Sequence, residues 1–259
     1  MKTYTKLILN KTKYIMISYL TNYELQNAVF HLRPPRQLSE KYIDERELIW
    51  RQELERTKKS GKGLWNGIVY TIEEMLQPDD ETLHIVLSSC EYKDIIFRIK
   101  KGRSNILKEY GISHLPKYIT LDCIPQTRDR KFVFGIRGNS TILDGGCIGL
   151  IGGTANKDEM EINCVEDLKK FMIKEIKEET RIKVADNKLS LYSINQFNAK
   201  YEFLYKLFLD IDSSEIGMCH KEGEFHELLC LTAVEVHKYS GPTLDAFNYS
   251  RLYIDKFLK

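Results

Sequence analysis

The sequence lacks the features that mark membrane, secreted and zinc-scaffold proteins. No apolar run approaches the ~18 residues that a membrane-spanning helix needs. The first residues, MKTYTKLILNKTKY, contain neither the long apolar stretch nor the cleavage site of a signal peptide. The six cysteines are scattered, with no C-x-x-C pair and no histidine spacing that would hold zinc. We therefore expect a soluble cytoplasmic protein with reduced cysteines and no contact with a membrane.

The sequence also lacks a basic surplus, internal repeats and low-complexity tracts. Its formal net charge is +2, whereas nucleic-acid-binding domains commonly show a basic stripe and an isoelectric point above ~9. Long nucleic acid is therefore not expected as a partner. With 259 residues, of which 42% are hydrophobic, the chain can bury a sizeable core in one large domain or two small ones. The oligomeric state stays open, a homodimer included.

The segment from Cys164 to Thr180 is predicted to form a helix. Asn163 followed by Glu166 has the spacing of a capping box, in which each residue's side chain bonds the other's backbone N–H. Apolar residues then recur at helical spacing. Near the end of the segment, three carboxylates fall within an arc of about 100° and so share one patch. These carboxylates are Glu175, Glu178 and Glu179.

The three carboxylates should repel one another. Like charges at these spacings cost about 0.2–0.5 kcal/mol each, and the helix macrodipole disfavours anions near a C-terminus. A bound divalent cation would offset this repulsion. The alternative is an ordinary solvated face, because Lys174 can pair with Glu178, and Glu179 with Lys183. Taken alone, the helix favours the solvated face, and the longer pattern around it favours the cation.

That longer pattern is a Gly-Gly pair after an apolar run, then an acid, seven residues, a base and Glu-Ile-x-Glu-Glu. It resembles the signature of the Nudix hydrolases, G-x5-E-x7-R-E-U-x-E-E-x-G-U, in which U is a bulky aliphatic residue. On this resemblance Gly153 corresponds to the first glycine and Glu166 to the first acid. The further matches are Lys174 for the arginine, Glu175 and Ile176 for the E-U pair, Glu178 and Glu179 for the paired acids, and Ile182 for the closing aliphatic residue.

Three positions depart from the signature. Thirteen positions separate Gly153 from Glu166 where the signature has six, which implies a seven-residue insertion near KDEMEIN. Lys174 replaces an arginine that orients a catalytic glutamate in the family, and an ammonium group cannot offer the same two-pronged contact. Arg181 replaces the glycine that ends the helix, where a left-handed conformation is usual and strains a residue with a side chain. All the metal-facing acids of the signature are nevertheless present.

The resemblance implies metal-dependent hydrolysis of the diphosphate linkage of a nucleoside diphosphate joined to another group. Carboxylates favour hard Mg²⁺ or Mn²⁺, which neutralise phosphate oxygens and acidify the attacking water. Glu175 and Glu179 would be the first metal ligands, with Glu178 as a third ligand or as the general base. Lys174 would orient one of these acids.

Residues outside the helix should complete the site. A fourth acid is expected from a loop, with Glu227 as the preferred candidate and Glu222 and Glu224 as competitors. Gly152 and Gly153 fit a loop that approaches a metal ion or phosphates closely, although glycine pairs are more often plain turns.

Three larger side chains are candidates for substrate binding. Arg137, at the end of a predicted strand, could grip a phosphate, or it could lie on the surface. Trp65 and Tyr92 could stack on a uracil, or they could belong to the core. The short segments Leu64–Gly67 and Tyr92–Asp94 resemble the N-terminal extension of animal Nudix enzymes that hydrolyse UDP-glucose and UDP-galactose. This narrower resemblance implies a UDP-sugar substrate that yields UMP and a sugar 1-phosphate.

Two other classes of function remain open. One is a Nudix enzyme that acts on another nucleotide, such as capped RNA, ADP-ribose or a dinucleoside polyphosphate. The other is a catalytically weak Nudix module that binds or senses a nucleotide, which Lys174 and Arg181 would favour.

The order of predicted elements indicates an α+β chain with a mixed sheet between helices. Residues 1–117 are read as a small α+β N-terminal extension, and residues 118–259 as the Nudix domain, an α/β/α sandwich. The predicted strands are 14–19, 28–32, 68–73, 83–87, 118–124, 131–137, 148–151, 189–197, 201–209 and 228–232, and the predicted helices are 39–59, 164–180 and 243–258.

Overall fold

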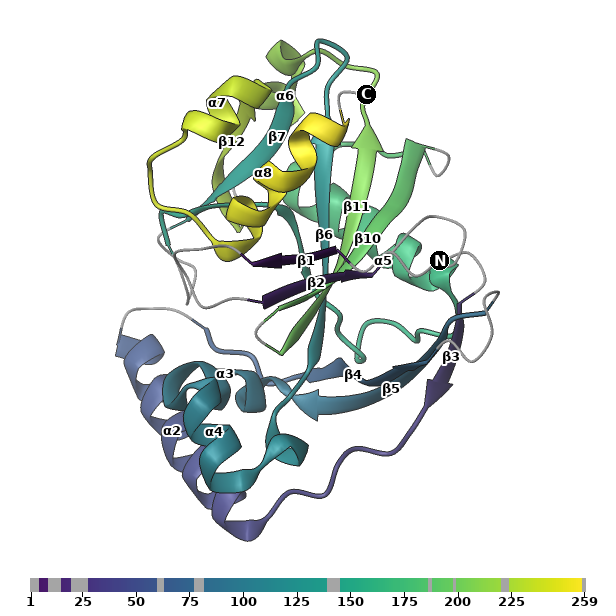
Figure 1. Ribbon diagram of the computed structural model, residues 1–259. Helices are drawn as coiled ribbons and strands as arrows, with labels where there is room; N and C mark the ends of the chain where they lie inside the picture. The colour runs from purple at the N-terminus through teal and green to yellow at the C-terminus, as the bar shows by residue number, and fades with distance from the viewer. Residues whose placement is uncertain are drawn as a thin grey trace. The chain divides into compact units, whose positions relative to one another are not determined.

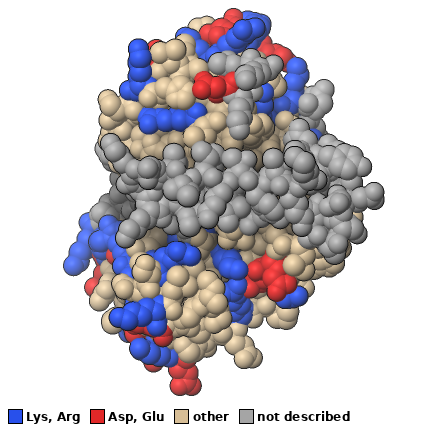
Figure 2. All heavy atoms as spheres, viewed as in Figure 1, with Lys and Arg blue, Asp and Glu red and all other residues tan. Residues whose placement is uncertain are grey.

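The computed structural model is a mixed α+β chain, as the sequence predicts (Figure 1). Within the part that the structure describes, no helix is both long and apolar enough to cross a membrane. On the face drawn in Figure 2, Lys and Arg side chains are interspersed with Asp and Glu over the described surface. The described residues are 5–8, 15–19, 28–59, 63–76, 82–138, 145–185, 188–197, 199–219 and 224–257, the first two ranges by their backbone alone.

The chain divides into two compact units that interleave along the sequence. The first unit comprises Met1–Thr120, Thr154–Leu168 and Ser193–Phe203, and the second comprises the segments between and after them. The division into two contiguous domains, residues 1–117 and 118–259, stays a prediction. Five elements have residues in both units: β6 (Tyr118–Gln126), β9 (Ile151–Thr154), α5 (Val165–Thr180), β10 (Leu189–Phe197) and β11 (Lys200–Phe208).

The described part of the first unit combines antiparallel and parallel strand pairs with helices α2, α3 and α4. Strand β5 pairs in parallel with β3 and antiparallel with β4, and β4 pairs with the start of β6 at Thr71 and Tyr118. Strands β1 and β2 form an antiparallel pair, and β2 continues onto β10. The other elements are β1 (Thr5–Ile8), β2 (Ile15–Tyr19), β3 (Val29–Leu32), α2 (Glu40–Lys59), β4 (Ile68–Leu76), β5 (His84–Glu91), α3 (Tyr92–Lys101), α4 (Arg103–Tyr110) and the 3-10 turn η1 (Ile112–His114).

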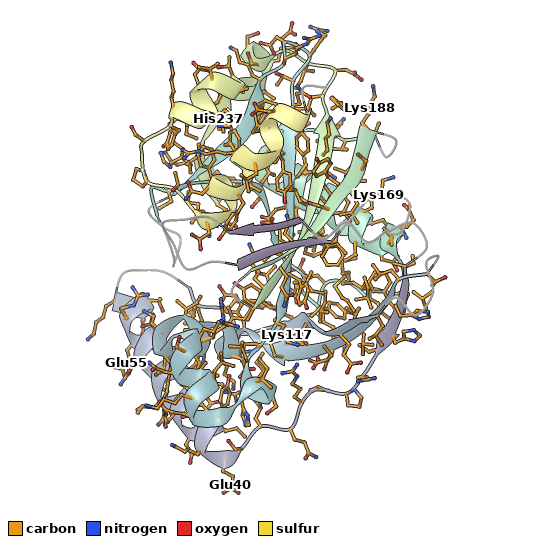
Figure 3. The ribbon with its side chains drawn as sticks, in the orientation of Figure 1. Glu40, Glu55, Lys117, Lys169, Lys188 and His237 are labelled. Carbon is orange, nitrogen blue, oxygen red and sulfur yellow. The ribbon has the colours of Figure 1, made fainter. Side chains whose placement is uncertain are left out.

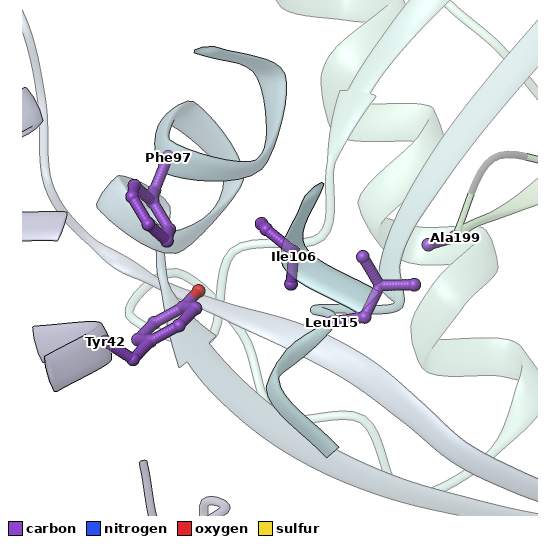
Figure 4. Packing of buried hydrophobic residues seen from close by; sticks show 5 residues of the cluster. All are labelled: Tyr42, Phe97, Ile106, Leu115 and Ala199. Atoms are coloured by element: carbon purple, nitrogen blue, oxygen red, sulfur yellow. The ribbon is translucent and has the colours of Figure 1, made fainter. Parts of the chain in front are cut away.

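Helix α2 is amphipathic and supplies the centre of the first unit's core. Tyr42 and Trp50 are buried on one side of it, while the exposed Glu40 and Glu55 point outward (Figure 3). The Tyr42 ring meets Phe97 edge-on, with centroids 4.8 Å apart, in a geometry that aromatic pairs favour. Figure 4 shows the buried cluster around this pair: Tyr42, Phe97, Ile106, Leu115 and Ala199.

The second unit is built around β7, which pairs with β6, β8 and β12, all antiparallel. Helix α8 packs next to β8, where a side chain at Gly149 would collide with Leu244. The Phe134 ring of β7 contacts the Phe247 ring of α8, with centroids 4.8 Å apart. The remaining elements are β7 (Phe132–Arg137), β8 (Ile148–Gly149), α6 (Ser213–Cys219), β12 (Phe225–Leu231), α7 (Ala233–Lys238) and α8 (Asp245–Phe257).

Most predicted elements are confirmed within one to four residues at their ends. The predicted strand 148–151 is wrong in one respect, because the chain breaks at Leu150 into β8 and β9, which pair with different neighbours. The short helices α3, α4, α6 and α7 were not predicted, since at 6 to 10 residues each they give too little periodicity to detect.

Candidate functional site

Helix α5 begins at Val165, but its cap differs from the predicted one. The Asp167 carboxylate accepts hydrogen bonds from the backbone N–H groups of Asn163 (3.0 Å) and Cys164 (3.2 Å). Asp167 therefore provides the acid that was expected from Glu166, one position further along the chain. The carboxylate also favours a helix N-terminus through the macrodipole.

The insertion that departs from the Nudix signature joins strand β4 in the first unit. The backbone N–H of Lys157 donates to the Ile68 carbonyl at 2.7 Å, and the Asp158 carboxylate accepts from the Ile68 N–H at 3.0 Å. The Tyr70 hydroxyl donates to the Met160 carbonyl and accepts from the Ile162 N–H. The added residues are thus ordered by backbone and side-chain contacts with β4.

The end of α5 has the left-handed residue that the sequence predicts. Arg181 has φ +59°, and its N–H donates to the Lys177 carbonyl at 2.9 Å. The Thr180 hydroxyl accepts from the Ile182 N–H at 3.1 Å, so the chain turns sharply after the helix. A side chain in this conformation costs roughly 1–2 kcal/mol relative to right-handed backbone, so this helix end is strained.

Gly152 and Gly153 lie on strand β9, in contrast to the predicted loop, and both are in close contact with neighbours. Gly152 has φ +146°, and a side chain there would sit 2.0 Å from the Leu121 carbonyl oxygen. Its N–H donates to Oε2 of Glu179 at 2.8 Å. A side chain at Gly153 would lie 2.6 Å from Oε2 of Glu175. The backbone of Leu121 therefore requires glycine at position 152, and β9 lies close to both carboxylates of α5.

Glu179 is the buried member of the three carboxylates, with 6% of its surface exposed. Its Oε1 is buried and has no hydrogen-bond partner among the described residues. Burial raises the pKa of the Glu179 carboxyl well above its usual range, and the nearby carboxylates of Glu224 and Glu175 raise it further. Such crowding of acids around a buried oxygen is relieved when a cation binds there.

The fourth acid beside Glu179 is Glu224. Its Oε1 lies 2.5 Å from Nη2 of Arg137, the last residue of β7, and its backbone carbonyl accepts from the Gly138 N–H. In the sequence analysis Glu227 is the preferred fourth acid, but Glu227 is exposed on β12. The geometry favours Glu224 for this role. Glu222 lies outside the described residues.

Arg137 lies beside Glu224, and one of its guanidinium donors is not used by a described residue. Its Nε is buried and forms no hydrogen bond with a described residue, although its Nη2 contacts Glu224. An unused guanidinium donor beside crowded acids is suited to an anionic oxygen that arrives with a cation.

Glu178 and Lys174 lie on the exposed side of α5. The Lys174 Nζ is 3.8 Å from Oε1 of Glu178, and their side chains are 42% and 57% exposed. This is the i, i+4 pair that the solvated-face alternative predicts. Of the three carboxylates, the structure therefore brings Glu175 and Glu179 together against β9 and places Glu178 toward solvent.

The acidic cluster suits Mg²⁺ or Mn²⁺ by the chemistry of its donors. Within the described part of the chain, no group of three or more His, Cys, Asp or Glu side chains is placed so that it could hold a metal ion by itself. Mg²⁺ does not require such a group, because it keeps several waters and is commonly held by one or two carboxylates. The partnerless Oε1 of Glu179 is the atom that fits such an ion.

Trp65 and Tyr92 lie in the first unit, where their rings contact each other. Their ring centroids are 5.5 Å apart, and a side chain at Gly67 would collide with the Trp65 ring. The Asn66 amide bonds Glu91 and the Lys93 N–H, which fixes the start of α3. Because Trp65 is 46% exposed, stacking of a base on it stays a prediction.

No sequence-family model matches the chain, and no curated protein matches it. Many solved structures are similar over part of its length, and three are described here. The Nudix domain of Shewanella oneidensis NrtR, complexed with ADP ribose, aligns with 61% of this chain and 99% of its own, at 14% identity and a TM-score of 0.41. The MutT protein from Methanosarcina mazei Go1 aligns with 54% of this chain and 91% of its own, at 16% identity and a TM-score of 0.38.

A Nudix hydrolase from M. smegmatis, RenU, aligns with 54% of this chain and 83% of its own, at 10% identity and a TM-score of 0.36. Similarities this weak do not place the chain in a family. The case for one therefore depends on the signature residues and on the geometry around Glu179.

Proposed function

We propose that the chain is a Nudix-type hydrolase that uses Mg²⁺ or Mn²⁺ to cleave the diphosphate linkage of a nucleoside diphosphate joined to another group. The observation that carries the proposal is Glu179, a buried carboxylate with one partnerless oxygen, crowded by Glu175 and Glu224. A structural acid would be paired with a cation, whereas this one contacts a backbone N–H. All the acids of the signature are present, and two of them meet at this point.

Some residues of the chain bind the cation, and others bind the phosphates. Glu179 and Glu175 hold the cation, which supplies charge neutralisation of the phosphate oxygens and a more acidic attacking water. Gly152 and Gly153 keep β9 free of side chains at the carboxylates. Arg137 releases Glu224 and donates to a phosphate oxygen, since its guanidinium matches phosphate well.

The general base is the least constrained assignment. Glu178 is exposed and pairs with Lys174, so as a base or third ligand it must turn away from the lysine. Lys174 then orients Glu178 in the apo protein, and this contact is lost when the acid is engaged. Positioned acid–base catalysis commonly contributes about 10²–10⁴-fold in rate.

The narrower proposal is a UDP-sugar substrate. It rests on the resemblance of Leu64–Gly67 and Tyr92–Asp94 to the extension of UDP-sugar hydrolases. Water adds to one phosphorus, the bridging P–O bond breaks, and the products are UMP and a sugar 1-phosphate.

Product analysis tests both levels of the proposal. The protein is incubated with Mg²⁺ and, separately, with UDP-glucose, UDP-galactose, ADP-ribose, a dinucleoside polyphosphate and capped RNA, and the products are separated. UMP with sugar 1-phosphate supports the narrow proposal. Cleavage of another substrate supports only the Nudix-type reaction, and absence of turnover on every substrate contradicts both.

A second candidate is a nucleotide-binding module with little catalysis. The exposed Lys174–Glu178 pair favours it, because two signature residues are then engaged with each other. Binding of a nucleotide with Mg²⁺, measured by calorimetry and without product after long incubation, would support this candidate.

A further inference from the structure

The first unit contains a cavity of about 300 Å³ that none of the proposed catalytic residues lines. Its walls come from the segment before α2, from α2, β4, β5 and α3, and from the turn that follows α4. The lining includes apolar residues such as Leu38, Ile43 and Leu115 and polar residues such as Arg46 and Ser89. A concave space of this size with a few converging polar groups is typical of small-molecule sites.

The charges around the cavity are already paired. Arg36 contacts the Glu73 carboxylate and donates to the Ser113 carbonyl at 2.8 Å. Arg46 contacts Asp94 at 2.8 Å and Glu91 at 3.2 Å. Both guanidinium groups are thus neutralised by carboxylates, and the cavity offers no spare cation. A phosphate or another anion would meet a wall with no positive charge to receive it.

One hydrogen-bond donor of the cavity lining lacks a partner. The Nε of Arg46 is buried and forms no hydrogen bond with a described residue, whereas the buried Tyr42 hydroxyl interacts with Asp94. Burial raises the pKa of Tyr42, and the nearby Asp94 raises it further, so the hydroxyl keeps its proton. Buried donors are nearly always satisfied in folded proteins, so a partner with an acceptor atom is expected here.

We propose that this cavity binds an uncharged heterocycle of the nucleobase kind. Such a molecule has a flat apolar body, which suits lining residues such as Ile43 and Leu115. Its carbonyl or ring-nitrogen acceptors suit the Arg46 Nε, and its amino groups suit the Glu73 carboxylate. The inference does not depend on the proposed hydrolysis, because it uses other residues and needs no metal ion.

The test is binding of uridine, cytidine, adenosine and guanosine to the full chain in the presence of a chelator, with inorganic phosphate as a further probe. Calorimetry gives the affinity, and each nucleoside at about 1 mM should also raise the melting temperature if it binds the folded state. At least one nucleoside is expected to bind, and phosphate is not.

Ile43→Trp is the informative variant, because Ile43 lines the cavity from the partly exposed side of α2. We expect it to weaken nucleoside binding by about tenfold or more. Leu48→Trp is its matched control, since Leu48 is 53% exposed on the same helix and does not line the cavity. It should bind like the wild type. If Ile43→Trp does not fold, Ser113→Trp blocks the cavity from an exposed position outside α2.

Glu179→Gln separates this site from the acidic cluster. It should bind nucleosides like the wild type, whereas loss of binding in this variant would assign the ligand to the cluster and overturn the inference. The inference also fails if no nucleoside binds the wild type, if phosphate alone binds the cavity, or if the folded Ile43→Trp and Ser113→Trp variants both bind normally. None of these failures bears on turnover.

Discussion

The two units each bury a cluster of charges, and the clusters are built differently. In the first unit, Arg46 is 6% exposed, and each carboxylate around it contacts a cation. The carboxylates are Glu47, Glu91 and Asp94, and Lys93 adds a second cation to Glu47 and Glu91. In the second unit, the buried Glu179 accepts a hydrogen bond from backbone alone, and Arg137 contacts Glu224.

The difference indicates what each cluster does. A buried ion network in which each charge contacts an opposite charge fixes the positions of the helices that carry it. Burial, nearby like charges and a partnerless oxygen all make a charged carboxylate unfavourable in free energy. A bound cation offsets that unfavourable free energy. The first cluster is therefore structural, and the second is the one suited to chemistry.

The largest expected effect comes from breaking the paired network. Asp94→Ala removes one of the three carboxylates that contact Arg46 and the acid that accepts the Glu91 N–H at the start of α3. Because Glu47 and Glu91 still contact Arg46, we expect the loss of a hydrogen bond to a charged group, about 1.5–3 kcal/mol. Urea denaturation should show a loss of that size. Glu45→Ala, which removes a half-exposed ion pair with Lys101, should cost at most about 1 kcal/mol, and an equal loss in both variants would contradict the distinction.

Removing the unpaired charge should instead affect turnover. Glu179→Gln keeps the shape of the side chain and removes the charge that holds the cation. We expect the Mg²⁺-dependent rate to fall by at least about 10²-fold, with the fold intact by circular dichroism. A rate close to that of the wild type would remove Glu179 from the metal site.

The same variant has a readout that needs no substrate. Burial, with Glu224 and Glu175, raises the pKa of Glu179 in the folded, metal-free protein well above its ordinary value of 4.5. The folded state then binds a proton more tightly than the unfolded state, so wild-type stability should fall as pH rises from about 4.5. Glu179→Gln should lack this fall. A wild type that gains stability relative to the variant over this range would contradict the assignment.

The Glu178→Gln variant tests whether an exposed acid takes part in catalysis. The signature assigns it to the metal site or to the general base, so we expect turnover to fall by at least about 10²-fold here as well. Stability should change by less than about 0.5 kcal/mol, because the Lys174 contact is an exposed i, i+4 pair. A loss of turnover below tenfold would show that Glu178 belongs to the solvated face.

A comparison of Glu224→Gln with Glu227→Gln decides which acid joins the cluster. Glu224 contacts Arg137 and raises the pKa of Glu179, whereas Glu227 is exposed. We expect Glu224→Gln to lower kcat/KM by about tenfold, or about 1.4 kcal/mol of transition-state stabilisation. Glu227→Gln should be within about twofold of the wild type. The reverse order would restore the sequence-based preference for Glu227.

The smallest expected effect concerns the ends of two helices. In the first unit, α3 ends at Gly102 with φ +83°, whereas α5 ends at Arg181 with φ +59°. Arg181→Gly should relieve the strain and, after the entropy cost of glycine, stabilise the protein by about 0.5–1 kcal/mol. Thermal unfolding measures the gain, and Arg181→Ala should give none. Destabilisation by Arg181→Gly would mean that the arginine side chain makes a contribution of its own.

The sequence by itself determined the elements with strong local signals. Helices α2 and α5 follow from the recurrence of apolar residues every three to four positions, and β10 and β11 follow from apolar runs. The strained end at Arg181 follows from the resemblance to the Nudix signature, which has a glycine at this position. These features depend on neighbours along the chain, so the sequence is enough to find them.

The tertiary structure alone decided which acids work together. Gly152 binds Glu179 across 27 positions, and nothing near either residue in the sequence indicates that Glu179 is buried while Glu178 is solvated. The same holds for Glu224, which no local pattern separates from Glu227. Three acids on one helix face look alike in sequence, because the burial that distinguishes them comes from a strand elsewhere in the chain.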